Sequence, residues 1–75
     1  MNRKLLALRA KVNKLIDSSE YKSVKLYGIS CSRSDLEMVI FFADILLRQG
    51  NINGYCIYNN DIKKIFAEAG ITIES

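Results

Sequence analysis

The stretch SDLEMVIFFADILLRQG, residues 34–50, decides the fold of this chain. Ser34 and Glu37 have the spacing of a capping box, in which a serine hydroxyl and a glutamate three residues later satisfy the first backbone N–H groups of a helix. Gly50 supplies the residue that most readily takes the left-handed conformation after a helix end. The sequence therefore predicts a central helix from about Asp35 to Gln49.

This central helix is apolar around most of its circumference, at 100° of rotation per residue. One face carries Leu36, Val39, Ile40, Ala43 and Leu47. The opposite side carries Met38, Phe41, Phe42 and Ile45. A helix that is apolar all round must be covered all round, and a chain of 75 residues has limited material for that. We therefore expect the second side to meet a second copy or a constitutive partner. The alternative encloses the helix between a sheet and the first helix.

Four further segments show periodic patterns. Residues 3–17 form an amphipathic helix with one apolar stripe, and residues 61–69 form another, capped by Asn59 or Asn60 and closed by Gly70. Residues 24–30 and 54–58 are rich in β-branched and aromatic side chains and predict strands. Residues 71–73 are a possible last strand.

The predicted fold class is α+β, or a small α/β fold, with the order α-β-α-β-α in one domain of residues 1–75. Two or three short strands are packed by helices. A β-α-β step implies parallel strands joined by a right-handed crossover. The runner-up is mostly helical, with residues 55–58 as an extended loop between two helices.

The charge of the chain is unevenly distributed. Eight of the 11 lysines and arginines lie in residues 1–33, whereas six of the eight acidic residues lie in residues 34–75. Such asymmetry favours a basic surface directed at an acidic partner. The candidate nucleic-acid-binding residues are Arg3, Lys4, Lys11, Lys14, Lys22, Lys25 and Arg33, with Tyr21 and Tyr27 as stacking surfaces. A solvated helix face that serves only solubility is the competing interpretation. A membrane-surface helix is disfavoured because its apolar stripe lacks aromatic anchors.

Residues 31–34 lie where a strand leads into a helix, and such a junction attracts anions. Plain N-capping by Ser32 or Ser34 explains them more simply. The two cysteines, Cys31 and Cys56, are expected to be reduced and partly buried, because nothing in the sequence indicates an oxidising compartment.

No catalytic residues, metal ligands or cofactor motif can be assigned. The chain has no histidine, which removes the commonest general base and a leading metal ligand. We therefore expect a cytoplasmic, non-enzymatic regulatory protein that contacts nucleic acid through its first helix and forms a homo-oligomer. The alternative is an inhibitor or adaptor of a larger protein, which would use the central helix together with Tyr55 and Tyr58.

Overall fold

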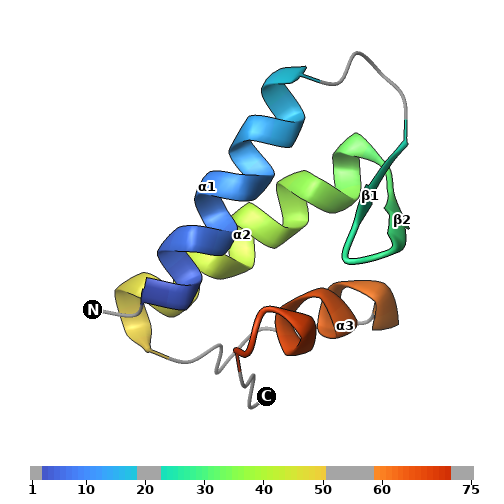
Figure 1. The fold of residues 1–75 in the computed structure, drawn as a ribbon. Helices are drawn as coiled ribbons and strands as arrows, with labels where there is room; N and C mark the ends of the chain where they lie inside the picture. The colour runs from blue at the N-terminus through green and yellow to red at the C-terminus, as the bar shows by residue number, and fades with distance from the viewer. Residues whose placement is uncertain (1–2, 19–22, 51–58, 72–75) are drawn as a thin grey trace.

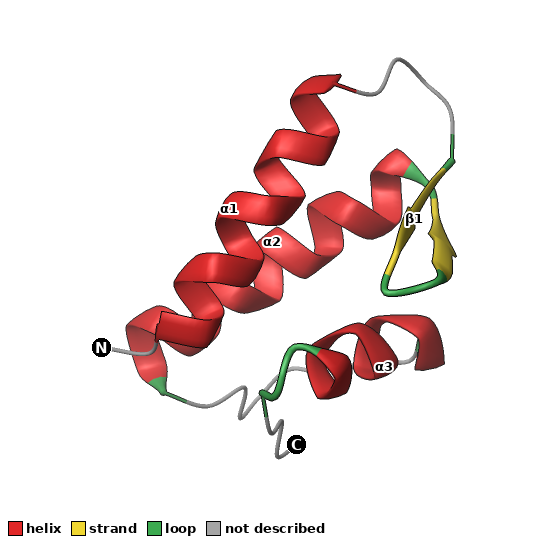
Figure 2. Cartoon of the chain, viewed as in Figure 1, coloured by secondary structure: helices red, strands yellow, loops and turns green. Residues whose placement is uncertain are grey.

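The computed structural model describes residues 3–18, 23–50 and 59–71. In chain order these residues form the helix α1 (Arg3–Ser18), the strands β1 (Val24–Leu26) and β2 (Ile29–Cys31), and the helices α2 (Arg33–Gln49) and α3 (Asn60–Glu68). The fold is thus a small, mostly helical α+β arrangement (Figures 1 and 2). The predicted fold class is confirmed.

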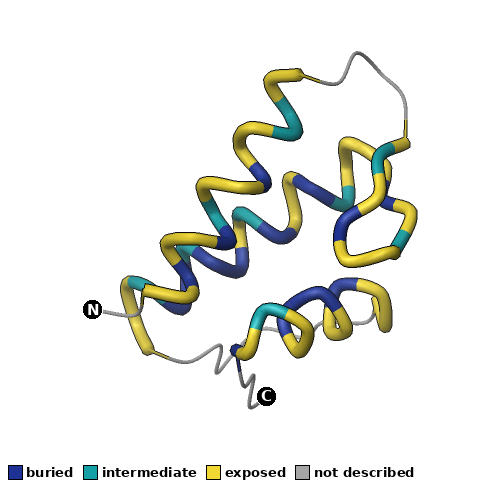
Figure 3. The backbone as a smooth tube through the Cα atoms, in the orientation of Figure 1, coloured by how far each residue is buried: buried dark blue, intermediate teal, exposed yellow. Residues whose placement is uncertain are grey.

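Helix α2 is the centre of the arrangement and contacts α1, α3 and β2. Helices α1 and α2 run antiparallel side by side, and α3 lies with the hairpin on the other side of α2 (Figure 1). Apolar side chains from every described element meet between them, and the buried parts of the helices face inward (Figure 3). The largest fully buried side chains include Leu8, Leu26, Leu36, Ile45 and Phe66.

The predicted single strand over residues 24–30 is wrong, because a turn divides it into a hairpin. Strands β1 and β2 pair antiparallel, with Leu26 opposite Ile29 and Val24 opposite Cys31. The two residues between them, Tyr27 and Gly28, have φ of 53° and 77°. Two positive φ angles in a two-residue loop are the pattern of a type I′ turn, whose twist suits a hairpin.

Tyr27 is an unusual residue for the first position of such a turn, which favours asparagine, aspartate and glycine. A left-handed backbone places the Cβ of an ordinary residue near the next carbonyl oxygen and costs about 1 kcal/mol. Gly28 adopts its positive φ without that cost. Gly28, which lies inside the predicted strand, is therefore the second residue of the turn.

Helix α2 begins two residues earlier than predicted. Its N-cap is Ser32, whose hydroxyl accepts a hydrogen bond from the Asp35 N–H at 3.2 Å, while the Asp35 carboxylate accepts one from the Ser32 N–H at 2.9 Å. The capping box is therefore Ser32 with Asp35, and the predicted pair Ser34 with Glu37 is wrong. The predicted end is confirmed: Gly50 has φ of 81° and donates its N–H to the Leu46 carbonyl.

Helix α3 has its predicted cap, face and end. The Asn59 side chain accepts a hydrogen bond from the Asp61 N–H at 2.8 Å, and Ile62, Ile65 and Phe66 are buried. After the helix, Gly70 donates to the Ala67 carbonyl and Ile71 to the Phe66 carbonyl. These two bonds with a left-handed Gly70 form a Schellman motif. The buried Ile71 side chain packs against the core.

Several predictions lie outside the described residues: the strand over 54–58, the alternative loop over 55–58, most of the strand over 71–73, and Tyr21 and Cys56. The strand pair that the structure describes is antiparallel. The predicted parallel β-α-β step would need a strand within residues 54–58, so it stays a prediction.

Candidate nucleic-acid interface

The basic face of α1 is the candidate site. Arg3, Lys4, Lys11 and Lys14 are all exposed, and at 100° per residue they fall within about 100° of one another. A separate arc of the same helix carries the buried Leu5, Leu8 and Val12. Burial of these leucines and the valine against α2 thus orients the basic residues toward solvent.

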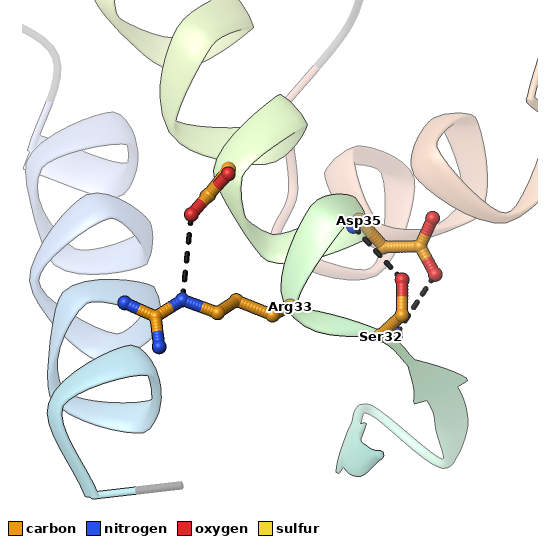
Figure 4. Close-up of polar contacts among 4 residues, drawn as sticks. Ser32, Arg33 and Asp35 are labelled. Carbon is orange, nitrogen blue, oxygen red and sulfur yellow. Dashed lines mark hydrogen bonds and ion pairs between the residues drawn. The ribbon is translucent and has the colours of Figure 1, made fainter. Parts of the chain in front are cut away.

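The structure divides the basic residues into ion-paired and open groups. The Nε atom of Arg9 lies 2.8 Å from Oδ1 of Asp44 in α2, and Nε of Arg33 lies 3.4 Å from Oε1 of Glu37. Figure 4 shows the second pair on the first turns of α2. Within the described part of the chain, no acidic side chain forms an ion pair with the predicted site residues Arg3, Lys11, Lys14 and Lys25. The same is true of Arg48, Lys63 and Lys64 on α2 and α3.

Lys4 is directed at the end of another helix. Its Nζ atom donates to the Gly70 carbonyl at 3.5 Å, at the point where α3 ends. Cations are favoured at helix C-termini, where carbonyl groups carry partial negative charge. Lys4 therefore connects α1 with α3 as well as contributing charge to the basic face.

Lys11 connects α1 with the tip of the hairpin. Its Nζ atom lies 4.5 Å from the centre of the Tyr27 ring, within the range of a cation–π interaction. Both residues are exposed, Tyr27 to 38%. The structure thus brings together a basic residue and an aromatic residue that the sequence separates by sixteen positions.

The remaining predicted basic residues differ in how available they are to contact nucleic acid. Lys25 lies in the middle of β1 and is exposed, because the buried Leu26 next to it points to the opposite face of the ribbon. Arg33 is exposed but held by Glu37 in the first turn of α2. Lys22 lies outside the described residues. The candidate basic surface is therefore the α1 face, and Lys25 is an exposed basic residue on the hairpin whose tip contacts Lys11.

The predicted apolar interface on α2 is split by the structure. Phe42 is 3% exposed and Ile45 is 1% exposed, so both belong to the core of a single copy and not to an open face. Phe41 and Met38 are 50% and 39% exposed. The Phe41 ring also meets the Phe42 ring edge to face, with centroids 5.4 Å apart. Tyr55 and Tyr58 lie outside the described residues.

At residues 31–34 the structure confirms the simpler interpretation, N-capping by Ser32, over an anion site. The Asp35 carboxylate takes the Ser32 N–H, as Figure 4 shows, and its other oxygen accepts a 3.4 Å hydrogen bond from the Asn59 side chain. Cys31 is fully buried. Burial raises the pKa of its thiol, and the charges of Asp35 and Asp61 add to the rise. A thiol in this environment is the opposite of an activated nucleophile.

Two further observations limit the chemistry of the described residues. They contain no group of three or more side chains that could hold a metal ion. Their helices include none with the length and apolar character needed to cross a membrane.

Sequence reasoning missed the contact between Lys11 and Tyr27 because it treated residues 24–30 as one strand. The signal was present as Tyr27-Gly28 between two alternating segments, which has the length of a hairpin turn. Tyrosine rarely begins such a turn, so the pattern favours a single strand that contains a glycine.

Comparison of the chain with protein-family models, with curated proteins and with solved structures found no match.

Proposed function

We propose that this chain is a small, cytoplasmic, non-enzymatic regulatory protein that binds nucleic acid through the basic face of α1. The observation that carries the proposal is a group of basic side chains on α1 and β1 without an acidic partner among the described residues: Arg3, Lys11, Lys14 and Lys25. Lysine and arginine bind phosphates without a sequence motif, and each neutralised phosphate releases a counterion.

The arrangement of ion pairs supports this proposal over a face that serves only solubility. Asp44 and Glu37 hold Arg9 and Arg33, on the side of the molecule where α2 lies beside α1. The acidic side chain on α1 itself, Asp17, is exposed and lies outside the arc of the basic face. Of the seven described basic side chains without an ion pair, four lie on α1 and β1 and three, Arg48, Lys63 and Lys64, lie on α2 and α3. The larger group makes the α1 side the stronger attractor of a polyanion.

Binding of a labelled oligonucleotide at several salt concentrations tests the proposal. We expect affinity to fall steeply as salt rises. Lys14→Gln should weaken binding several-fold and reduce the slope of log affinity against log salt by about 1. Lys64→Gln on α3 removes the same charge from another exposed position and should change little. No binding at low salt, or equal effects of the two variants, would refute the proposal.

A second candidate function is protein binding through α2, either to a second copy or to a larger protein. The exposures of Phe41 and Met38 favour it, since large apolar side chains on a surface often mark an interface. The candidate surface is now smaller than the sequence suggested, because Phe42 and Ile45 are buried.

The mass in solution, measured by light scattering, tests self-association. A dimer should have twice the mass of the 8.5 kDa chain, and Phe41→Ser with Met38→Gln should return it to a single copy. Leu6→Gln on α1 changes an apolar residue of similar exposure, 37%, and should leave the mass unchanged. A wild-type protein with the mass of one copy rules out the homo-oligomer, and a partner protein would then have to be sought.

A further inference from the structure

Tyr27 lies at the tip of the β1–β2 hairpin in a backbone conformation that does not suit it. Its φ of 53° is left-handed, and asparagine or glycine would satisfy this position without strain. Strained residues of this kind are found preferentially where a side chain is used in binding. The question is therefore what the Tyr27 ring does that asparagine could not do.

Stability does not answer that question. The one ring interaction that the described residues give Tyr27 is the ammonium group of Lys11, 4.5 Å from the ring centre. A cation–π contact between exposed groups is similar in size to the strain of a left-handed tyrosine. The contact therefore roughly offsets the strain, so it does not by itself account for a tyrosine at this position.

The position of the ring is suited to ligand contact. Tyr27 is 38% exposed, and Lys11 holds it beside the basic face of α1. Lys14 is three residues after Lys11 on the same helix, and residues at this spacing are neighbours on a helix surface. Lys25 is two residues before Tyr27 on β1. An exposed aromatic ring thus contacts Lys11, and Lys14 and Lys25 are the next exposed lysines along α1 and β1. None of the three lysines forms an ion pair with a described acid.

We propose that Tyr27 is a base-stacking residue and that the ligand of the basic face is a single-stranded nucleic acid. This inference rests on the proposed function and specifies the form of the nucleic acid. Bases of a single strand are available to stack on an aromatic ring, while lysines beside the ring follow the phosphates. In a duplex the bases are already stacked on one another, so Tyr27 gains nothing from it.

Three variants at one position test the stacking role. Tyr27→Asn suits the left-handed turn, so the hairpin should keep its structure, which circular dichroism and amide NMR spectra can verify. Tyr27→Phe retains the ring. Tyr27→Trp introduces the only tryptophan of the chain and provides a fluorescent reporter at the site.

The probes are a short oligothymidylate strand and the same strand annealed to oligodeoxyadenylate. We expect Tyr27→Asn to bind the single strand about tenfold more weakly and the duplex as the wild type does. Tyr27→Phe should bind both probes as the wild type does, and the strand should quench the fluorescence of Tyr27→Trp. Unchanged affinity of Tyr27→Asn for the strand, or an equal loss for the duplex, would overturn the stacking role alone. A wild-type protein that binds neither probe at low salt would overturn the proposed function as well.

Discussion

The guanidinium of Arg9 on α1 and the carboxylate of Asp44 on α2 form an ion pair between the two longest helices, with Nε and Oδ1 2.8 Å apart. Arg48 is four residues after Asp44 on the same helix, a spacing that also permits an ion pair. Because α1 and α2 are antiparallel neighbours (Figure 1), Arg9 reaches Asp44 from the side. The pair also removes Arg9 from the charge that the basic face can offer to a ligand.

Asp44→Asn should lower the free energy of unfolding by less than about 1 kcal/mol, because both side chains are more than one-third exposed. The loss should shrink at high salt, where exposed charges are screened. Urea unfolding at low and high salt measures both effects. Asp17→Asn is the matched control, since Asp17 is an exposed acid on α1 with no ion pair among the described residues. Equal losses in the two variants would show that the Arg9–Asp44 contact contributes nothing.

Phe41→Leu and Phe42→Leu should have very different effects although the residues are adjacent. Phe42 is 3% exposed and Phe41 is 50% exposed, so only Phe42→Leu leaves a cavity in the core. We expect Phe42→Leu to lower the free energy of unfolding by about 1–3 kcal/mol and Phe41→Leu by less than about 0.5 kcal/mol. Urea unfolding of both variants checks the difference. A larger loss for Phe41→Leu would mean that the burial assigned to the two rings is reversed.

Much of the fold was predictable from the sequence because local signals and packing agree. The stripes of α1 and α3, the left-handed glycines after α2 and α3, and the cap at Asn59 are all present. The hairpin was not predictable with the same rules. Tyr27-Gly28 has the length of a hairpin turn, but tyrosine at the first turn position contradicts the usual turn chemistry. The observed pairing of β1 with β2 decides between a hairpin and a single strand.

The surfaces were less predictable than the elements. Helical periodicity places Phe42 and Ile45 with Met38 and Phe41 on one side of α2. A prediction from periodicity therefore treats this side as one surface that is either wholly open or wholly covered. The structure instead buries two of the four within one copy. Which part of a helix circumference is covered depends on the position of its neighbours along the helix. That information belongs to the tertiary arrangement and not to the pattern of one helix.

The stability of the protein should depend on pH through Cys31. Burial and two nearby carboxylates raise the pKa of this thiol in the folded state, whereas an unfolded cysteine titrates near about pH 8.5. Below that pH both states keep the proton and Cys31 adds no pH dependence. Above it the unfolded state releases the proton while the folded state retains it. The free energy of unfolding therefore falls, by at most about 1.4 kcal/mol per pH unit.

Urea unfolding of the wild type and of Cys31→Ala, in steps of about one unit from about pH 7 to about pH 10, measures the contribution of this thiol to stability. Every other ionisable group is common to the two proteins, so the difference between the two slopes isolates Cys31. We expect the wild type to lose stability more steeply than Cys31→Ala. Parallel curves would show that the pKa of the thiol does not differ between the folded and unfolded states.

The start of α2 provides a comparison between two serines. Ser32→Ala removes the hydroxyl that accepts the Asp35 N–H and should lower the free energy of unfolding by about 1 kcal/mol. Ser34→Ala should cost almost nothing, because alanine is a better helix former and Ser34 is an exposed residue in the first turn. Urea unfolding of the two variants tests the assignment of the cap. If Ser34→Ala were the more destabilising variant, the helix would begin where the sequence alone placed it, with Ser34 as the cap.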